Sequence, residues 1–149
     1  MQTLSAEISP MGKVSIPAGV TLTGFNTRFG NFNGDLLLSY WTRTSPGGSG
    51  SVALQATSEF SPAGGPTVGT VTYYCTGATL GTGCSGTQTI QTTSQTPVVT
   101  LPGGICTGGG GSCSGQDPNT VQVLFELPNR PQYKTGSYSV QLTFTISTL

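Results

Sequence analysis

The chain has 149 residues, enough for one domain with a sizeable core, and only 7% of them are charged. Its five acidic and five basic residues balance, so it offers no basic surface for the phosphates of a nucleic acid, and we expect no nucleic-acid partner. It contains no histidine, which excludes a Ser-His-Asp or Cys-His nucleophile and any zinc site that uses histidine.

The first expected element is an alternating segment at the N terminus. Leu4, Ala6 and Ile8 are separated by polar residues, which is the pattern of a strand with one apolar face. A proline and then a glycine end the alternation. We therefore expect an N-terminal strand with its linker over residues 1–12 and a β-sandwich domain over residues 13–149.

Two segments in the first half of the chain predict a hairpin. Residues 35–43 carry apolar side chains on both faces, which indicates a central strand. The two faces hold Leu36, Leu38 and Tyr40, and Leu37 and Trp41. A glycine-rich turn then leads into residues 51–58, which alternate, and we expect the two segments to pair.

Four cysteines occur as two close pairs around glycine-rich loops. Of the three pairings that four cysteines allow, two local bridges, Cys75–Cys84 and Cys106–Cys113, are favoured because each loop folds back easily. A zinc site of four thiolates usually has about two to four residues between paired ligands, which this spacing does not provide. The cysteines thus predict disulfide bonds and an oxidising compartment.

Further short segments show strand patterns, and none has a helical period. They are residues 68–74, 87–93, 97–102, 120–127 and 137–146. Residues 87–93 are polar and residues 97–102 are bounded by prolines, so both are expected at sheet edges. About seven to nine strands predict an all-β fold, an immunoglobulin-like antiparallel β-sandwich.

No group of side chains points to catalysis. The carboxylates are scattered along the chain and suggest no glycosidase pair: Glu7, Asp35, Glu59, Asp117 and Glu126. Residues 31–35 alternate oxygen ligands but lack the distal glutamate of a calcium loop, so a weak cation site there is a minor alternative. We expect no enzyme, no catalytic residue, no cofactor and no metal ion.

Aromatic side chains offer another candidate surface. Core packing is expected for most of them, and a sugar-binding or adhesive face is the alternative. They are Phe25, Phe29, Phe32, Tyr40 and Trp41. Phe25 and Phe29 lie in a loop, where their placement is least determined.

Both ends of the chain resemble a known family. Gly136-Ser137-Tyr138, followed by alternation through Phe144, resembles the C-terminal strand of fimbrial subunits assembled by donor-strand complementation, which includes chaperone–usher pilins and spore coat U-like domains. Residues 3–10 are similar to the donor strand of alpha-class, colonisation-factor-like pilins. The two small cysteine loops in the middle of the chain differ from those pilins.

The resemblance implies a mechanism of assembly. In such pilins the groove beside the C-terminal strand accepts the N-terminal strand of a neighbouring subunit, a β-augmentation. Leu4, Ala6 and Ile8 are then the donor strand. The acceptor edge is the last expected strand, with its apolar residues Tyr138, Val140, Leu142, Phe144 and Ile146.

The function implied is that of a secreted structural subunit of a bacterial surface filament (a pilus or fimbria) or coat, in cell adhesion. The partners implied are copies of the chain itself, a periplasmic chaperone and an usher, and a glycan or surface ligand. We expect an extracellular or cell-surface location, export by a signal peptide that is not present in this chain, and no membrane span, since the longest apolar runs are too short.

The alternative hypothesis is a self-contained extracellular carbohydrate-binding or adhesin module. In that case residues 3–8 complete the sheet of their own chain. The two hypotheses therefore differ in whose N-terminal strand lies beside the last strand.

Overall fold

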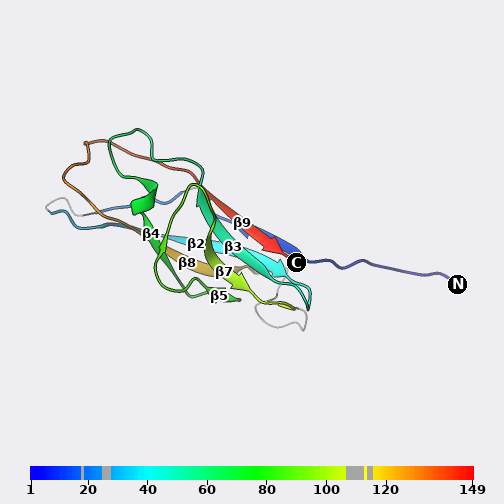
Figure 1. Cartoon of the computed structure of the whole chain (residues 1–149). Coiled ribbons are helices and arrows are strands. Elements are labelled where there is room, and N and C mark those ends of the chain that lie inside the picture. Colours follow the sequence, from blue (N-terminus) through cyan, green and yellow to red (C-terminus); the bar gives the residue numbers. More distant parts are fainter. Residues whose placement is uncertain (18, 25–27, 107–112, 114–115) are drawn as a thin grey trace.

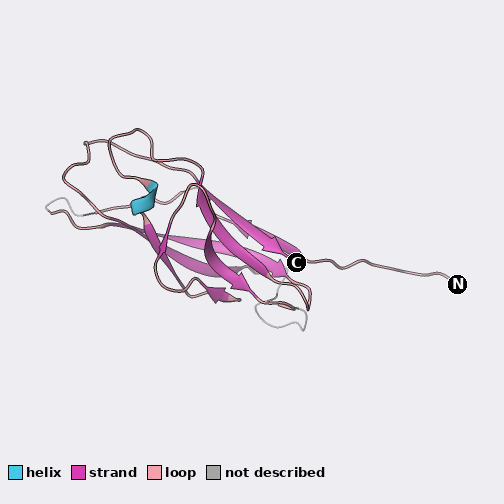
Figure 2. Ribbon diagram, viewed as in Figure 1, coloured by secondary structure: helices cyan, strands magenta, loops and turns pink. Residues whose placement is uncertain are grey.

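The computed structural model of the chain is a β-sandwich of two antiparallel sheets packed face to face (Figure 1). It describes residues 1–149 except 18, 25–27, 107–112 and 114–115. Strands and connecting loops make up almost all of the described chain, and one turn of 3-10 helix, η1 (Val68–Thr70), precedes β4 (Figure 2). The expected all-β, immunoglobulin-like antiparallel sandwich is therefore confirmed.

The first sheet has five strands in the order β1-β2-β8-β4-β6. They are β1 (Met11–Ser15), β2 (Phe32–Arg43), β8 (Asn119–Leu127), β4 (Thr72–Thr76) and β6 (Gln88–Thr89). β2 pairs with β1 on one side and with β8 on the other, as expected for a central strand. β6 is two residues long and lies at the edge, where the polar segment 87–93 was expected.

The second sheet has four strands in the order β5-β7-β3-β9. They are β5 (Thr82–Gly83), β7 (Thr96–Leu101), β3 (Gly50–Ala56) and β9 (Leu142–Thr148). β1 and β9 are edge strands of their sheets and lie next to each other on one side of the sandwich.

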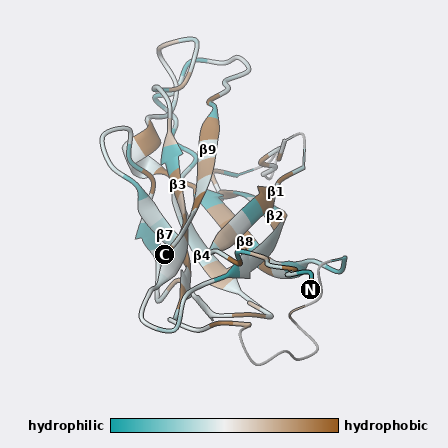
Figure 3. Ribbon diagram, turned by 90° about the vertical axis from the view of Figure 1, so that its right-hand side faces the viewer, coloured by the Kyte–Doolittle hydropathy of each residue, from teal (hydrophilic) through white to brown (hydrophobic). Residues whose placement is uncertain are grey.

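The core lies between the sheets and follows the alternation of the strands. Along β8, every second residue from Asn119 to Leu127 is buried, because side chains on a strand alternate between its faces. Leu38 and Tyr40 of β2 and Val52 and Leu54 of β3 are fully buried and meet across the interface between the sheets. Figure 3 shows hydrophobic and hydrophilic residues alternating along the strands.

The expected hairpin between residues 35–43 and 51–58 is wrong. β2 and β3 belong to different sheets, and residues 44–49 carry the chain from one sheet to the other. Thr44 holds this crossing: its Oγ1 donates to the Pro102 carbonyl oxygen at 2.8 Å and accepts from the Ile105 amide at 2.9 Å. The chain thus closes the sandwich at this point instead of extending one sheet.

The edge position expected for residues 97–102 is also wrong, since β7 pairs with both β5 and β3. Pro97 lies opposite Ala53, where the register between β3 and β7 shifts. A bulge is one of the few places inside a sheet that tolerate a proline, because the regular ladder of hydrogen bonds is interrupted there.

Candidate functional site

The N-terminal segment, residues 1–10, belongs to neither sheet. It extends away from the sandwich (Figure 1), and each of its residues is exposed. Leu4 is 100% exposed and Ile8 75% exposed, and Ala6 between them is exposed too. The strand expected over residues 3–8 therefore has no partner within its own described chain, although its alternation is that of a half-buried strand.

Arg43 of β2 fixes the base of this segment. Its Nε and Nη2 donate to the Ser9 carbonyl oxygen at 3.0 and 2.7 Å. Ser9 is two residues before β1, whose first residue, Met11, is paired with Arg43 in the sheet. The N-terminal segment thus leaves the body at a point set by hydrogen bonds, beside the edge of the sandwich.

β9 presents an open edge at the same side of the molecule. The amide of Thr57 donates to the Gln141 carbonyl oxygen at 3.0 Å, and the amide of Leu149 donates to that of Ser49 at 2.9 Å. Both bonds continue the register of the β3–β9 ladder. Hydrogen-bonded and non-bonded pairs alternate in an antiparallel ladder. The main-chain amides and carbonyls of the odd-numbered residues of β9 therefore bond to β3, and those of the even-numbered residues point away from β3.

The even-numbered residues of β9 are Leu142, Phe144, Ile146 and Thr148. The main-chain amides and carbonyls of these residues point to the outer edge of β9. Within the part of the chain that the structure describes, no strand pairs with that edge. Their side chains face inward: Leu142, Phe144 and Ile146 are half-buried and pack against the core. An added strand would therefore find both free main-chain groups and apolar side chains at this edge.

The last strand begins later than the sequence predicts, at Leu142. Tyr138 and Val140 precede β9, and between them Ser139 forms an isolated bridge with Ser61. The Tyr138 hydroxyl donates to the Lys134 carbonyl oxygen at 2.6 Å. Leu142, Phe144 and Ile146 lie in β9 as predicted, whereas Tyr138 and Val140 belong to the preceding loop, which pairs with the chain near Ser61.

The strand order matches an immunoglobulin-type sandwich with one position empty. Such a sandwich has strands A-B-E-D in one sheet and C-F-G in the other. β1, β2, β8 and β4 take positions A, B, E and D, and β3 and β9 take positions C and F. None of the described strands takes position G, which lies beside F.

No protein-family model matches the chain, and neither a curated protein nor a solved structure is significantly similar to it. The assignment of strands to positions A to F therefore rests on their order and pairing in this chain.

The disulfide bonds join Cys75 to Cys84 and Cys106 to Cys113, which is the expected pairing. Cys75 and Cys84 pack against the core beside β4 and β5. Two disulfides are consistent with a protein that folds in an oxidising compartment. No helix among the described residues is long and apolar enough to cross a bilayer.

The predicted aromatic surface is divided between core and exterior. Tyr40 is buried and Phe32 packs against the core, whereas Phe29 is 64% exposed. Trp41 lies on the outer face of the first sheet, where Lys13 Nζ is 5.0 Å from the centre of its ring. Phe25 lies outside the described residues.

The polar residues considered for a catalytic or cation site lie far apart or bind neighbouring groups of the chain. Asp35 Oδ2 accepts a hydrogen bond from Gln122 Nε2 at 2.8 Å on the outer face, and Asn33 Nδ2 bonds to the Asn31 carbonyl oxygen. Glu59 Oε2 accepts from the Val68 amide at the start of η1. No cluster of three or more potential metal ligands of the types His, Cys, Asp and Glu occurs within the described ranges.

Two buried tyrosines of the first sheet bind main-chain oxygens outside it, Tyr73 one in β7 of the second sheet and Tyr40 one in the loop before β5. The Tyr73 hydroxyl donates to the Pro97 carbonyl oxygen at 2.6 Å and lies 2.9 Å from Thr96 Oγ1, and the Tyr40 hydroxyl donates to the Leu80 carbonyl oxygen. Loss of water around these hydroxyls raises the pKa of both tyrosines above the ordinary value. Their hydrogen bonds to neutral partners indicate a structural role.

Proposed function

We propose that the protein is a structural subunit of a surface filament or coat, and that residues 3–8 of one copy add a strand beside β9 of the next. The observation that carries this proposal is the combination, in one chain, of an empty G position beside β9 and an unpaired alternating segment. This combination fits the resemblance of the two chain ends to subunits assembled by donor-strand complementation.

The segment and the edge have matching dimensions. An extended strand rises about 3.3 Å per residue, so residues 3–8 span about 20 Å and the seven residues of β9 span about 23 Å. A strand of this length can pair with most of the open edge and remove it from water, which protects the sheet from unspecific pairing.

The apolar faces also match. When Leu4, Ala6 and Ile8 point inward, they join the half-buried Leu142 and Phe144 at the side of the core, and Ser5 and Glu7 point outward. Burial contributes about 1.5–3 kcal/mol for each large apolar side chain, and each main-chain hydrogen bond a further net ~0.5–1.5 kcal/mol.

Pairing with another copy is favoured over pairing within one chain. The N-terminal segment leaves beside the end of β9, so pairing with its own β9 needs a sharp reversal at Ser9 and Pro10. The two hydrogen bonds from Arg43 to Ser9 oppose that reversal because they hold the backbone in line with β1. The same surfaces on successive copies form an open, head-to-tail contact, which generates a filament.

The location and further partners follow from the same proposal. A subunit of this kind is exported and stays at the cell surface, where its two disulfides are stable. Before assembly its open edge needs temporary cover, and a periplasmic chaperone with an usher fills that role.

A charge placed on the apolar face of the N-terminal segment tests the proposal. We expect the unaltered chain to form polymers, seen by size-exclusion chromatography and negative-stain microscopy, and the double variant Leu4→Asp/Ile8→Asp to stay monomeric. Both side chains are exposed in the free subunit, so the thermal unfolding temperature of the monomer should not change.

The matched control is Ser5→Asp, which adds a charge on the polar face of the same segment and should leave polymers intact. A concentrated, unaltered chain that remains monomeric, with residues 3–8 protected from hydrogen exchange, would show pairing within one chain and contradict the proposal.

A further inference from the structure

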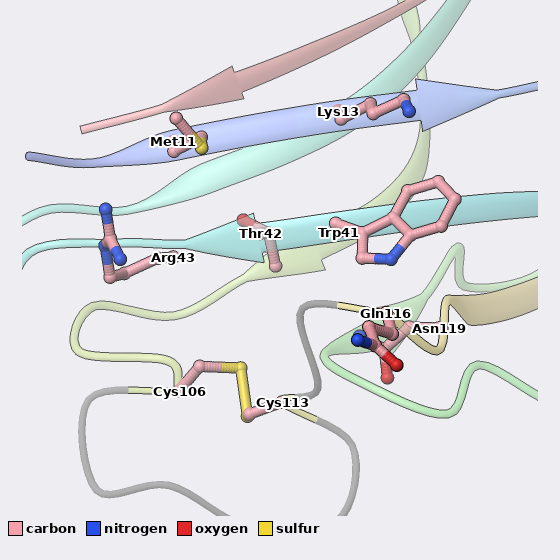
Figure 4. Close-up of a pocket in the computed structure, with 9 residues that line it drawn as sticks. All are labelled: Met11, Lys13, Trp41, Thr42, Arg43, Cys106, Cys113, Gln116 and Asn119. Atoms are coloured by element: carbon pink, nitrogen blue, oxygen red, sulfur yellow. A yellow bond between two sulfur atoms is a disulfide. The ribbon is translucent and has the colours of Figure 1, made fainter.

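A surface pocket of about 490 Å³ lies where β1 begins and β2 ends, beside the Cys106–Cys113 disulfide (Figure 4). The strands line it with Met11 and Lys13 of β1 and with Trp41, Thr42 and Arg43 of β2, and Gln116 and Asn119 lie at the start of β8. The volume is within the range of about 300–1,000 Å³ that small-molecule sites occupy.

Trp41 supplies the apolar part of this pocket. It is the only tryptophan of the chain, and it projects from β2 beside Lys13 of β1, whose Nζ is 5.0 Å from the ring centre. This cation–π contact holds both side chains on the outer face. The part of the indole that Lys13 does not cover offers an apolar surface for the C–H groups of a sugar ring.

The charge of the pocket is positive. Lys13 and Arg43 are two of the five basic residues of the chain, and none of the described residues that line the pocket is acidic. Arg43 uses Nε and Nη2 to bind the Ser9 carbonyl oxygen, but its guanidinium keeps its charge and has five N–H donors in all. In a chain of zero net charge, this local excess favours an anionic ligand.

The remaining walls are polar and held in place. Gln116 brings a side-chain amide, which can donate to and accept from hydroxyl groups, and the buried Asn119 supports the wall behind it. Asn119 is 3% exposed, and its Oδ1 accepts a hydrogen bond from Thr79 Oγ1 at 3.3 Å. Cys106 has a backbone φ of 67°, a conformation that is unfavourable for residues other than glycine and that is frequent at ligand sites.

We propose that this pocket binds an acidic saccharide. The carboxylate lies between Lys13 and Arg43, the C–H groups of the sugar pack against the part of the Trp41 indole that Lys13 does not cover, and the side-chain amide of Gln116 binds a hydroxyl group. The site consists of residues from one copy, so this inference does not depend on polymerisation. The carboxylate can belong to a sialic acid or to a uronic acid, since both carry a carboxylate on a sugar ring.

The single tryptophan makes the test specific, because fluorescence excited near the indole band reports on Trp41 alone. The full chain is titrated with 3′-sialyllactose, with a hyaluronan tetrasaccharide and with neutral lactose. We expect a saturable change of emission with at least one acidic oligosaccharide and a weaker or absent one with lactose. The acidic oligosaccharide that binds shows whether the pocket takes a sialic acid or a uronic acid.

Variants then test the residues. Lys13→Gln should weaken binding of the acidic sugar by about tenfold or more, since it removes a charged hydrogen-bond donor. Lys134→Gln removes the same charge from a distant loop and should leave the affinity unchanged. Trp41→Ala, which has no fluorescence signal, should abolish the heat of binding in calorimetry while circular dichroism confirms that it folds.

Three results would overturn the inference. They are no saturable signal with either acidic sugar, equal affinity for lactose and the acidic sugars, and an equal loss of affinity in Lys13→Gln and Lys134→Gln. None of these results bears on whether Leu4→Asp/Ile8→Asp stops polymerisation, so the two proposals can fail separately.

Discussion

Gly12 of β1 faces Ile146 of β9 where the edges of the two sheets meet. A methyl group on Gly12 would lie 3.0 Å from Ile146 Cγ1 and 3.0 Å from Thr148 Cγ2. Carbon atoms in contact are normally about 3.5–4.0 Å apart, so a side chain at position 12 would require the side chains of Ile146 and Thr148 to move. Glycine thus allows β1 to approach β9 and places the base of the N-terminal segment beside the open edge.

Gly12→Val should destabilise the domain by about 1–3 kcal/mol, the usual cost of overpacking a filled interface. The free energy of unfolding in urea measures this effect. Gly19→Val is the control, because a side chain at Gly19 would meet no atom within 4 Å. Equal stability of the two variants would show that the contact between β1 and β9 is loose.

Tyr73→Phe should cost about 1–2 kcal/mol. The substitution leaves the buried Thr96 Oγ1 and the Pro97 carbonyl oxygen without their hydrogen bonds to the Tyr73 hydroxyl, and the loss of a buried partner costs more than a new bond contributes. Tyr74→Phe, at the next position, removes a hydroxyl from a side chain that is 39% exposed and should change stability by less than about 0.5 kcal/mol. Urea unfolding of both variants distinguishes the loss of this hydrogen bond between the sheets from a general effect of removing a hydroxyl group.

Stability should fall at high pH because burial raises the pKa of Tyr40 and Tyr73. An unfolded tyrosine has a pKa of about 10. Below that pH the folded and unfolded states both keep the proton, so the contribution of the two tyrosines to the free energy of unfolding is complete. As the pH rises above about 10 toward the raised folded pKa, the unfolded state loses its protons first, and the free energy of unfolding decreases by at most about 1.4 kcal/mol per pH unit for each tyrosine. Unfolding curves between pH 8 and pH 11 measure this slope, which should be smaller in Tyr73→Phe.

The two disulfides should differ in their contribution to stability. They close loops of similar length, with sequence separations of 9 and 7, so the chain-entropy contribution is about 2–3 kcal/mol for each. Cys75 and Cys84 also pack against the core, whereas Cys106 and Cys113 line an open pocket. Cys75→Ser/Cys84→Ser should therefore lose more stability than Cys106→Ser/Cys113→Ser, and the reverse order would contradict this account of the packing.

Local patterns predict the strands well where alternation and burial agree. Residues 120–127 were predicted as a strand, and β8 spans Asn119–Leu127 with every second side chain buried. The same holds for the core of β2, where Leu38 and Tyr40 face inward. Alternation is a property of neighbouring residues, so it is visible without knowledge of the fold.

Pairing between strands is less visible in the sequence. Segments 35–43 and 51–58 follow each other as a hairpin would, but Thr44 anchors the crossing to the loop after β7 and the strands join different sheets. Pro97 indicates an edge by local rules, whereas a bulge opposite Ala53 allows it inside the sheet. In both cases the contact that decides the pairing joins residues that are far apart in the sequence.

The sequence by itself determined which face of each strand is apolar and that residues 3–8 have the pattern of a strand, and it favoured two local disulfide bridges over the other pairings. It could not show that these residues lie outside both sheets, or that β3 is the one described strand that pairs with β9, because strand order depends on contacts between distant segments. Only the tertiary structure decided that none of the described strands takes position G and that Lys13, Trp41 and Arg43 share a pocket with Gln116. The physical reason is that side-chain alternation is local, whereas edges, grooves and pockets form when separate parts of the chain pack together.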